Sequence, residues 1–346
     1  MSEARRLADA HSQELAWAFE RFGSRTAAPT RVAFADCEDT RMQEAVRILA
    51  ACGLVQPVVV GSPAGISWPK AVECIALDDP HWGPRISEAW IERRRVRSQA
   101  STLDLIAEEL NPLLFLAIGV GLGLAEAGVA GTQSISPAVI RAGIRGLGTI
   151  VGGGLVSGAF LVSAGEALWT WADCSVIPDP DSDQLAKIAF EAAVLHQLVT
   201  GDRPRVAMLS FSTAGNVDHP AVEKVRRALS VLHRGHPELD ADGEMQFDAA
   251  IDPEIGARKF PGSVVAGNAN VFVFPDLNAG NIAYKAAQRI GHARIMGSFV
   301  LGLSRPWIDL SRGCTTAEIV SSALALRATV SARHDLVSAG RENKEV

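Results

Sequence analysis

Cysteine and aromatic residues are scarce in this 346-residue sequence, and aromatic residues make up only 6% of it. The five cysteines form no CxxC pair, which argues against a disulfide framework or a structural zinc site. No HxxxH, HExxH or GxSxG spacing occurs, so a zinc-dependent protease and a Ser-His-Asp hydrolase are disfavoured. The 31 glycines, in contrast, favour an α/β architecture with tight turns between strands and helices.

Long uninterrupted apolar segments are also missing. Residues 1–25 are rich in charge and contain no apolar core, so we expect no secretory signal and a cytoplasmic protein with reduced thiols. Residues 112–125 are uncharged but too short to span a bilayer, and residues 146–165 are interrupted by glycines. We interpret both stretches as buried strands with their turns.

Basic residues are fewer than acidic ones: the sequence has 33 Lys and Arg residues and 39 Asp and Glu residues, so the net charge is −6. A field of this sign repels nucleic acids and anionic membranes, and we expect neither as a partner. An anionic substrate must therefore be held by local positive charge. The densest basic run, residues 93–97 (RRRVR), is by itself typical of a solvated helix face.

Apolar periodicity predicts a strand–helix–strand unit near the start of the chain. Residues 31–35 (RVAFA) and 57–61 (PVVVG) are short apolar strands. Between them, apolar residues from Met42 to Leu49 recur at helical spacing, and Gly53 ends the helix. Such strands imply a parallel sheet that helices cover on both faces.

The same alternation recurs in the second half of the chain. Strands are predicted at residues 206–211 and 271–274, helices near Leu185 and Pro220, and a final helix over residues 316–332. Together with the length of the chain, this repetition indicates two domains of the α/β class.

Three polar loops adjoin predicted elements: the first and third follow strands, and the second directly precedes the final helix. They are residues 274–281 (FPDLNAGN), 309–318 (DLSRGCTTAE) and 209–216 (LSFSTAGN). Ligands of open α/β sheets gather at the carboxyl ends of strands, and helix N-termini favour anions. Arg312 before the final helix suits a phosphate, while Thr315 and Glu318 also fit a capping box. The alternatives are an Asn that caps its own helix in the first loop and an ordinary turn in the third.

Two further features have plain structural interpretations. The glycines of residues 119–123 (GVGLG) lack the spacing of a dinucleotide-binding loop, and we interpret them as sites of close backbone packing. His196, which lies at helical spacing from apolar neighbours, is interpreted as a structural residue and not as a ligand.

The polar loops belong to a series of motifs that resembles the phosphate acetyltransferase (phosphotransacetylase) family in order and spacing. The motifs are residues 208–213 (MLSFST), 242–250 (DGEMQFDAA), 261–263 (PGS), 266–267 (AG), 275–281 (PDLNAGN) and 309–314 (DLSRGC). The resemblance extends from about Arg31 to the final helix, and two of these stretches favour the acetyl branch over the butyryl branch.

The resemblance implies two three-layer α/β/α domains with mostly parallel sheets and an active-site cleft between them. Domain one would comprise residues 1–152 and 301–346, and the inserted domain two would comprise residues 153–300. It further implies a homodimer that binds CoA or acetyl-CoA together with acetyl phosphate or phosphate. No metal and no cofactor are implied, since CoA is itself a substrate.

The resemblance also implies the reaction. A carboxylate removes the thiol proton of CoA, and the thiolate attacks the acetyl carbonyl directly in a ternary complex. Glu318 stands where the family has its base, an Asp. Ser311 matches a serine that hydrogen-bonds the reacting acetyl group, and Arg312 matches an arginine near the phosphate.

Further arginines are implied in the cleft. Arg141 matches one of them, and another falls among residues 93–95, where the spacing from Glu92 favours Arg94. The predicted substrate-binding residues are completed by four polar residues of the loops: Ser212, Thr213, Asn278 and Asn281.

Two alternative functions stay open. Leu124, Leu301 and Ile308 are apolar where the family is usually polar. Leu301 and Ile308 favour an acyltransferase for propionyl or butyryl phosphate, and all three residues favour a catalytically impaired regulatory protein that binds acetyl-CoA. Turnover of acetyl, propionyl and butyryl phosphates would distinguish the three functions.

Overall fold

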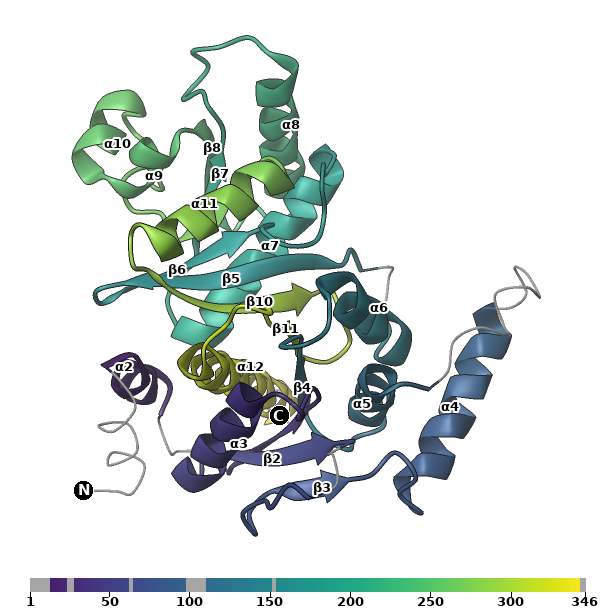
Figure 1. The fold of residues 1–346 in the computed structure, drawn as a ribbon. Coiled ribbons are helices and arrows are strands. Elements are labelled where there is room, and N and C mark those ends of the chain that lie inside the picture. Colours follow the sequence, from purple (N-terminus) through teal and green to yellow (C-terminus); the bar gives the residue numbers. More distant parts are fainter. Residues whose placement is uncertain (1–12, 24–27, 62–64, 98–109, 151–153, 343–346) are drawn as a thin grey trace. The chain divides into compact units, whose positions relative to one another are not determined.

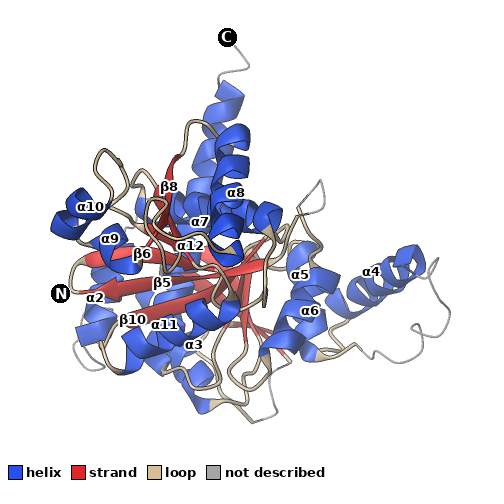
Figure 2. Ribbon diagram, turned by 90° about the horizontal axis from the view of Figure 1, so that it is seen from above, coloured by secondary structure: helices blue, strands red, loops and turns tan. Residues whose placement is uncertain are grey.

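The computed structural model describes residues 13–23, 28–61, 65–97, 110–150 and 154–342 (Figure 1). These residues form two compact units, one within residues 1–153 and 303–346 and the other within residues 154–302. Helices and strands make up most of the described chain (Figure 2), and in both units they mostly alternate along the sequence. Within the described part of the chain, no helix has the length and apolar character needed to cross a membrane.

The described strands of the first unit form a parallel sheet with the order β3–β2–β1–β4–β11. The strands are β1 (Thr30–Phe34), β2 (Val55–Val60), β3 (Glu73–Ile75), β4 (Ala127–Ala130) and β11 (Trp307–Asp309). At the centre, Val32 lies opposite Pro57 of β2 and Ala127 of β4. Because all strands run in one direction, the loops after β1, β4 and β11 lie at one edge of the sheet.

Helices cover both faces of this sheet (Figure 1). Those of the first unit are α2 (Gln13–Phe22), α3 (Thr40–Cys52), α4 (Trp82–Arg97), α5 (Pro112–Gly121), α6 (Ser136–Gly146) and α12 (Thr316–Glu342). Helices α3 and α12 pack on one face and α5 and α6 on the other, while α2 packs on α12 and α4 on α5. The predicted parallel α/β architecture is confirmed for this unit.

The ends of α3 follow the local signals in the sequence. The side chain of Asp39 accepts a hydrogen bond from the backbone N–H of Arg41 at the first turn. Gly53 ends the helix with a φ of 67°, a conformation that glycine adopts without steric penalty. The final helix also begins as predicted at Thr316, but it continues to Glu342 and not only to residue 332.

The interpretation of residues 112–125 as buried strands is wrong, because Pro112–Gly121 is the helix α5. A uniformly apolar run has no period that separates a buried helix from a strand. The capping residue was the available signal: the side chain of Asn111 accepts from the N–H of Leu114, and Pro112 occupies the first turn. In the second apolar stretch, Ser157–Ala164 is a strand as predicted, and residues 151–153 lie outside the described residues.

Two of the three glycines in residues 119–123 pack closely, as interpreted, but a Cβ atom on Gly123 would meet no atom within 4 Å. A Cβ atom on Gly146 of α6 would lie 2.4 Å from the Cβ of Ala117 in α5. A Cβ on Gly119 would lie 3.1 Å from the Leu124 side chain. Glycine therefore allows α5 and α6 to approach each other.

The described strands of the second unit form a mixed sheet with the order β10–β5–β6–β9–β7–β8. They are β5 (Ser157–Ala164), β6 (Ala167–Ala172), β7 (Arg205–Leu209), β8 (Asp240–Met245), β9 (Val271–Val273) and β10 (Arg294–Leu301). Strand β5 is antiparallel to β10 and β6, and the pairs from β6 to β8 are parallel. The mostly parallel character predicted from the sequence is thus confirmed.

Helices also cover both faces of the second sheet. They are α7 (Ser182–Thr200), α8 (Pro220–Gly235), α9 (Phe247–Ile251), α10 (Pro253–Lys259) and α11 (Leu277–Arg289). The neighbours Thr170 and Trp171 point to opposite faces of β6. Thr170 contacts buried His196 of α7 at 3.1 Å, which confirms the structural interpretation of that histidine. Trp171 instead joins a core cluster with Tyr284 of α11.

Candidate active site

In the first unit, the loop after β11 presents Ser311, Arg312 and Gly313 to solvent. Its turn is closed by a hydrogen bond from the N–H of Cys314 to the carbonyl of Ser311 at 3.0 Å. The hydroxyl oxygen of Ser311 accepts a hydrogen bond from the N–H of Gly313 at 3.3 Å. The guanidinium of Arg312 forms no ion pair or hydrogen bond with the described residues, so it is available to an anionic ligand.

Helix α12 begins directly after this loop with a capping box. The N–H of Thr315 donates to Oε2 of Glu318 at 2.8 Å, and the N–H of Glu318 donates to the Thr315 hydroxyl at 3.1 Å. This confirms the structural role foreseen for Glu318. Its role as the base stays a prediction, and a carboxylate has enough acceptor positions to cap a helix and receive a proton.

Two buried side chains lie at the ends of the same loop. Burial raises the pKa of Asp309 to about 6; a hydrogen bond from Ser136 lowers it and the charge of Asp36 raises it. Burial likewise raises the pKa of the Cys314 thiol to about 12. The thiol is therefore protonated at neutral pH, and we assign it no nucleophilic role.

The predicted arginines outside the loop have different surroundings. Arg141 lies on the exposed side of α6, and its guanidinium forms no ion pair or hydrogen bond with the described residues. Arg94 stands over the ring of Trp90 on its own helix, with its guanidinium carbon 5.8 Å from the ring centre. Arg93 donates to the carbonyl of Gly146 at the C-terminus of α6, where positive charge is favourable.

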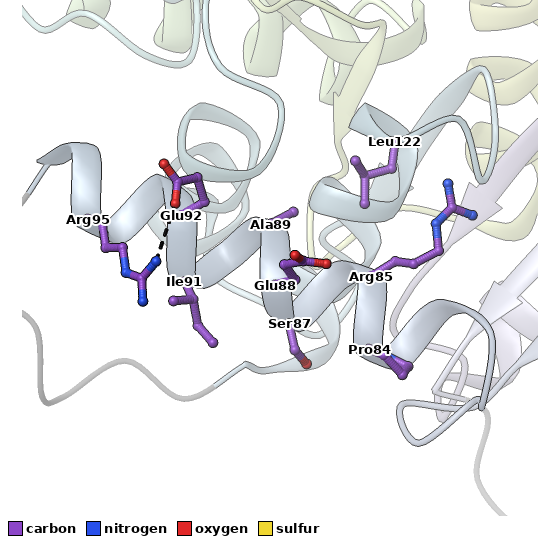
Figure 3. A pocket seen from close by; sticks show the side chains of 9 residues that line it. All are labelled: Pro84, Arg85, Ser87, Glu88, Ala89, Ile91, Glu92, Arg95 and Leu122. Carbon is purple, nitrogen blue, oxygen red and sulfur yellow. Dashed lines mark ion pairs between the residues drawn. The ribbon is translucent and has the colours of Figure 1, made fainter.

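A cavity of about 850 Å³ borders α4 (Figure 3). Its wall consists of eight residues of α4 together with Leu122, and it includes the exposed pair of Arg95 and Glu92, whose charged atoms are 3.7 Å apart. Neither Arg94 nor any residue of the Ser311–Gly313 loop lines it. We therefore do not assign the reaction to this cavity.

In the second unit, the loop after β7 turns two predicted substrate-binding residues inward. The buried hydroxyl of Ser212 donates to Oε1 of Glu244 at 2.7 Å, and the buried hydroxyl oxygen of Thr213 accepts from the N–H of Gln246 at 3.0 Å. Both hydroxyls thus form hydrogen bonds that stabilise the loop, and their contact with a substrate stays a prediction.

Glu244 holds this loop from β8. It is only 2% exposed and pairs with Nε of Arg226 at 2.8 Å. Its carboxylate also accepts from the N–H of Gly215 at 3.0 Å. Burial raises the pKa of Glu244, but the hydrogen bonds from Arg226, Ser212 and Gly215 outweigh burial, so the pKa is lowered.

The loop after β9 leads into α11. Asp276 caps this helix by accepting from the N–H of Ala279 at 3.0 Å, so the suggestion that an Asn provides the cap is wrong. Asn281 donates to the carbonyl of Cys174 at 3.2 Å and ties α11 to the segment after β6. Asn278 is exposed, and its side chain contacts no polar group among the described residues.

Two of the three residues that favoured the alternative functions lie in the core. Leu124 and Ile308 have no solvent exposure, and only Leu301, at the end of β10, is partly exposed. The two buried residues cannot line a binding surface in this structure. The part of the chain that the structure describes also contains no cluster of three His, Cys, Asp or Glu residues suited to a metal ion.

Comparison with known proteins identifies the family. The family model described as "Phosphate acetyl/butaryl transferase" matches residues 19–326. The chain belongs to this family. The phosphate acetyltransferase of Paracoccus denitrificans is 38% identical over 294 residues, which cover 82% of this chain and 90% of that protein. The phosphate acetyltransferase of Bacillus subtilis (strain 168) is 37% identical over 303 residues, which cover 85% and 93%.

A solved structure supports the same family. The EutD phosphotransacetylase from Staphylococcus aureus has a TM-score of 0.79 and 32% sequence identity, and the match covers 91% of this chain and 98% of that chain. The prediction of the phosphate acetyl/butyryl transferase family from the sequence motifs is therefore confirmed.

Sequence reasoning missed several residues that organise the family's loops in this chain. Arg41 contacts the backbone around Arg312, and Glu244 contacts the Ser212 loop. Asp36 follows β1 and accepts from the N–H of Gly131 at 2.7 Å. The position of Asp36 directly after β1 was an available signal, since ligands and loop contacts gather at that edge of the sheet.

Proposed function

We propose that this chain is a phosphate acetyltransferase that transfers an acetyl group reversibly between acetyl phosphate and CoA. The main support is the exposed Ser311–Gly313 loop, which presents the uncommitted guanidinium of Arg312 within the region that matches the family. An exposed arginine beside the N-terminus of α12 is suited to a phosphate group, because guanidinium donors and helix N–H groups both favour anions.

In the proposed mechanism, Glu318 accepts the proton of the CoA thiol. The sulfur then forms a bond to the acetyl carbon, and the bond from that carbon to the phosphate oxygen breaks, with the electron pair leaving on phosphate. A free thiol with a pKa of about 8.5 is mostly protonated at pH 7. A general base therefore contributes roughly 10²- to 10⁴-fold to the rate.

The other residues have complementary proposed roles. Ser311 receives a hydrogen bond from Gly313, which leaves its own O–H to donate to the acetyl carbonyl oxygen. Arg312 and Arg141 offset the repulsion between two anionic reactants, and Arg94 is proposed as a further contact to CoA. The contacts of Ser212, Thr213, Asn278 and Asn281 with a substrate are likewise proposed.

We further propose the two-domain organisation that the resemblance implies, with residues 1–152 and 301–346 in domain one, residues 153–300 in domain two, and an active-site cleft. A homodimer is proposed as the assembly. A cytoplasmic location is proposed as well and is supported by the five cysteines, all of which are free thiols. CoA is proposed as a substrate and not as a bound cofactor.

The test is turnover of acetyl, propionyl and butyryl phosphates with CoA, followed by thioester absorbance. We expect acetyl phosphate to give the highest kcat/KM. Losing one charge-assisted contact to phosphate removes about 1.5–3 kcal/mol, so Arg312→Ala should lower kcat/KM by roughly 10- to 100-fold. Arg305→Ala is the matched control, since Arg305 is also exposed but precedes β11, at its other end.

Each other outcome has a clear meaning. A clean, folded protein that turns over none of the three acyl phosphates would overturn the proposed function. A preference for butyryl phosphate would establish a different acyl group. Tight binding of acetyl-CoA in calorimetry without turnover would establish the regulatory alternative.

A further inference from the structure

Arg41, in the first turn of α3, holds the Ser311–Cys314 loop through its guanidinium. Nη1 donates to the carbonyl of Arg312 at 3.0 Å and to the carbonyl of Cys314 at 2.6 Å. These two carbonyls bracket the turn that exposes Gly313. The contact joins residues that are more than 270 positions apart in the chain.

The same side chain reaches two further loops at this edge of the sheet. Nη2 donates to the carbonyl of Thr132, after β4, at 3.3 Å. Nε and Nη2 donate to the carboxylate of Asp39, before α3, at 3.0 and 2.5 Å. Arg41 thus joins the segments that follow β1, β4 and β11.

The hydrogen-bond count separates support from ligand binding. A guanidinium has five N–H donors. Arg41 makes five contacts: two with Asp39 and one each with Thr132, Arg312 and Cys314. No donor is left for a substrate phosphate. Arg312, in contrast, has no such contact with the described residues.

Asp39 fixes the guanidinium in its orientation. Its carboxylate is 7% exposed and also caps α3 through the N–H of Arg41. The hydrogen bond from Arg41 holds the pKa of Asp39 below its ordinary value, against the effect of burial. The charged, planar pair is therefore present throughout the neutral pH range.

We propose that Arg41 is a positioning residue for the reaction: it sets the place of Ser311 and Arg312 through the backbone carbonyls of Arg312 and Cys314, and it does not touch the substrate. The inference rests on the proposed acetyl transfer for its kinetic consequence. A reacting group misplaced by about 1 Å can lower the rate by roughly 10²-fold, because the attacking and accepting atoms must be aligned. The rigid fork matters as well as the charge, so lysine should not replace arginine.

The experiment compares Arg41→Gln and Arg41→Lys with Arg31→Gln. Arg31 is a matched control, since the Arg31 and Arg41 side chains are 33% and 34% exposed. Arg31 donates through Nε and Nη2 to the carbonyl of Leu124 and pairs with Glu73 at 2.8 Å, but it lies near the start of β1, away from the loop.

We expect both Arg41 variants to lower kcat by about 10- to 100-fold while each KM changes less than about threefold. Arg31→Gln should leave kcat within about twofold of the unmodified protein, although we expect it to lower Tm by about as much as the Arg41 variants do. The proposal is overturned if Arg41→Gln keeps its kcat, if it raises the KM of CoA at constant kcat, or if Arg31→Gln loses kcat equally.

Alkylation of Cys314 by iodoacetamide gives a readout independent of turnover, with the peptide followed by mass spectrometry. The Cys314 thiol is buried at the end of the Ser311–Cys314 loop, and the positive charge of Arg41 lowers the pKa of the thiol. Arg41→Gln removes that charge, which by itself would slow alkylation, and Arg41→Lys keeps it, so faster alkylation in both variants reports loop opening. Unchanged alkylation contradicts the proposal. If the unmodified protein lacks acetyl transfer but the Arg41 variants open the loop, the proposed function fails and the positioning role stands.

Discussion

The capping box at the start of α12 allows the two roles of Glu318 to be separated by experiment. In the unmodified protein, the N–H of Thr315 donates to Oε2 of Glu318 at 2.8 Å. Glu318→Gln retains an oxygen that can accept this hydrogen bond, because glutamine also suits this position of a capping box. What glutamine removes is the negative charge and the ability to take a proton. Thr315→Ala does the reverse, since it removes the hydroxyl that accepts from the N–H of Glu318 and keeps the carboxylate.

The magnitudes differ enough to decide between the roles. Loss of a charge near a helix N-terminus costs about 0.3–1 kcal/mol, and loss of an N-cap hydroxyl about 1 kcal/mol. Each kilocalorie lowers Tm by roughly 2–4 °C in a domain of this size. Loss of a general base lowers turnover by roughly 10²- to 10⁴-fold, which corresponds to about 3–5 kcal/mol in the barrier.

The assay measures kcat, KM and Tm for Glu318→Gln, Glu318→Asp and Thr315→Ala. We expect Glu318→Gln to lose at least about 100-fold in kcat with a Tm shift below about 4 °C. Glu318→Asp should retain most of the rate because it restores a carboxylate. Thr315→Ala should lose Tm and keep kcat within about threefold. Equal kcat in Glu318→Gln and the unmodified protein would refute the base assignment and leave only the cap.

Two further predictions concern packing and buried charge. Gly146→Ala should lower Tm in calorimetry by roughly 4–8 °C, since the added Cβ would lie 2.8 Å from the backbone of residues 117 and 118. Gly235 is the control, because it also lies at a helix end but a Cβ there would have no atom within 4 Å. Gly235→Ala should therefore be neutral or stabilising. Glu244→Gln should destabilise the chain at pH 7 more than the exposed Glu223→Gln. Because folding lowers the pKa of Glu244, its stabilisation is present above the unfolded value of about 4.3 and is lost as the pH falls, so the difference in Tm from the unmodified protein should narrow in acid. A pH-independent difference for Glu244→Gln would contradict this.

Local signals in the sequence were sufficient for β1, α3 and β2. Each of these signals involves residues that are close in the sequence: an apolar strand, helical spacing from Met42 onward, and a glycine after the last turn of the helix. They failed for α5, where every position from Leu114 to Val120 is buried and no period exists to read. There, three-dimensional packing against α6 and the sheet determines the structure, and only the Asn111 cap and Pro112 in the first turn mark the helix in the sequence.

The candidate site divides in the same way. The Ser311–Arg312 loop was predicted because its residue types and its position directly before the final helix are local features. The inward orientation of Ser212 and Thr213 was not, since it depends on Glu244, which lies 32 residues beyond Ser212. Arg41 could not be assigned to the loop because its partners are more than 270 residues away in the sequence.

Three arginines of the first unit, Arg312, Arg141 and Arg41, show how the structure separates substrate binding from structural support where the sequence shows only like charges. Arg312 and Arg141 are exposed and hold no partner among the described residues, so their donors can be given to a phosphate without breaking an existing contact. Arg41 has given all five donors to protein oxygens, and any ligand would have to compete with them. Replacing a binding arginine should therefore weaken substrate affinity or transition-state stabilisation directly, whereas replacing Arg41 should act through the geometry of Ser311 and Arg312. The distinction follows from hydrogen-bond bookkeeping, and the split between KM and kcat in the two kinds of variant measures it.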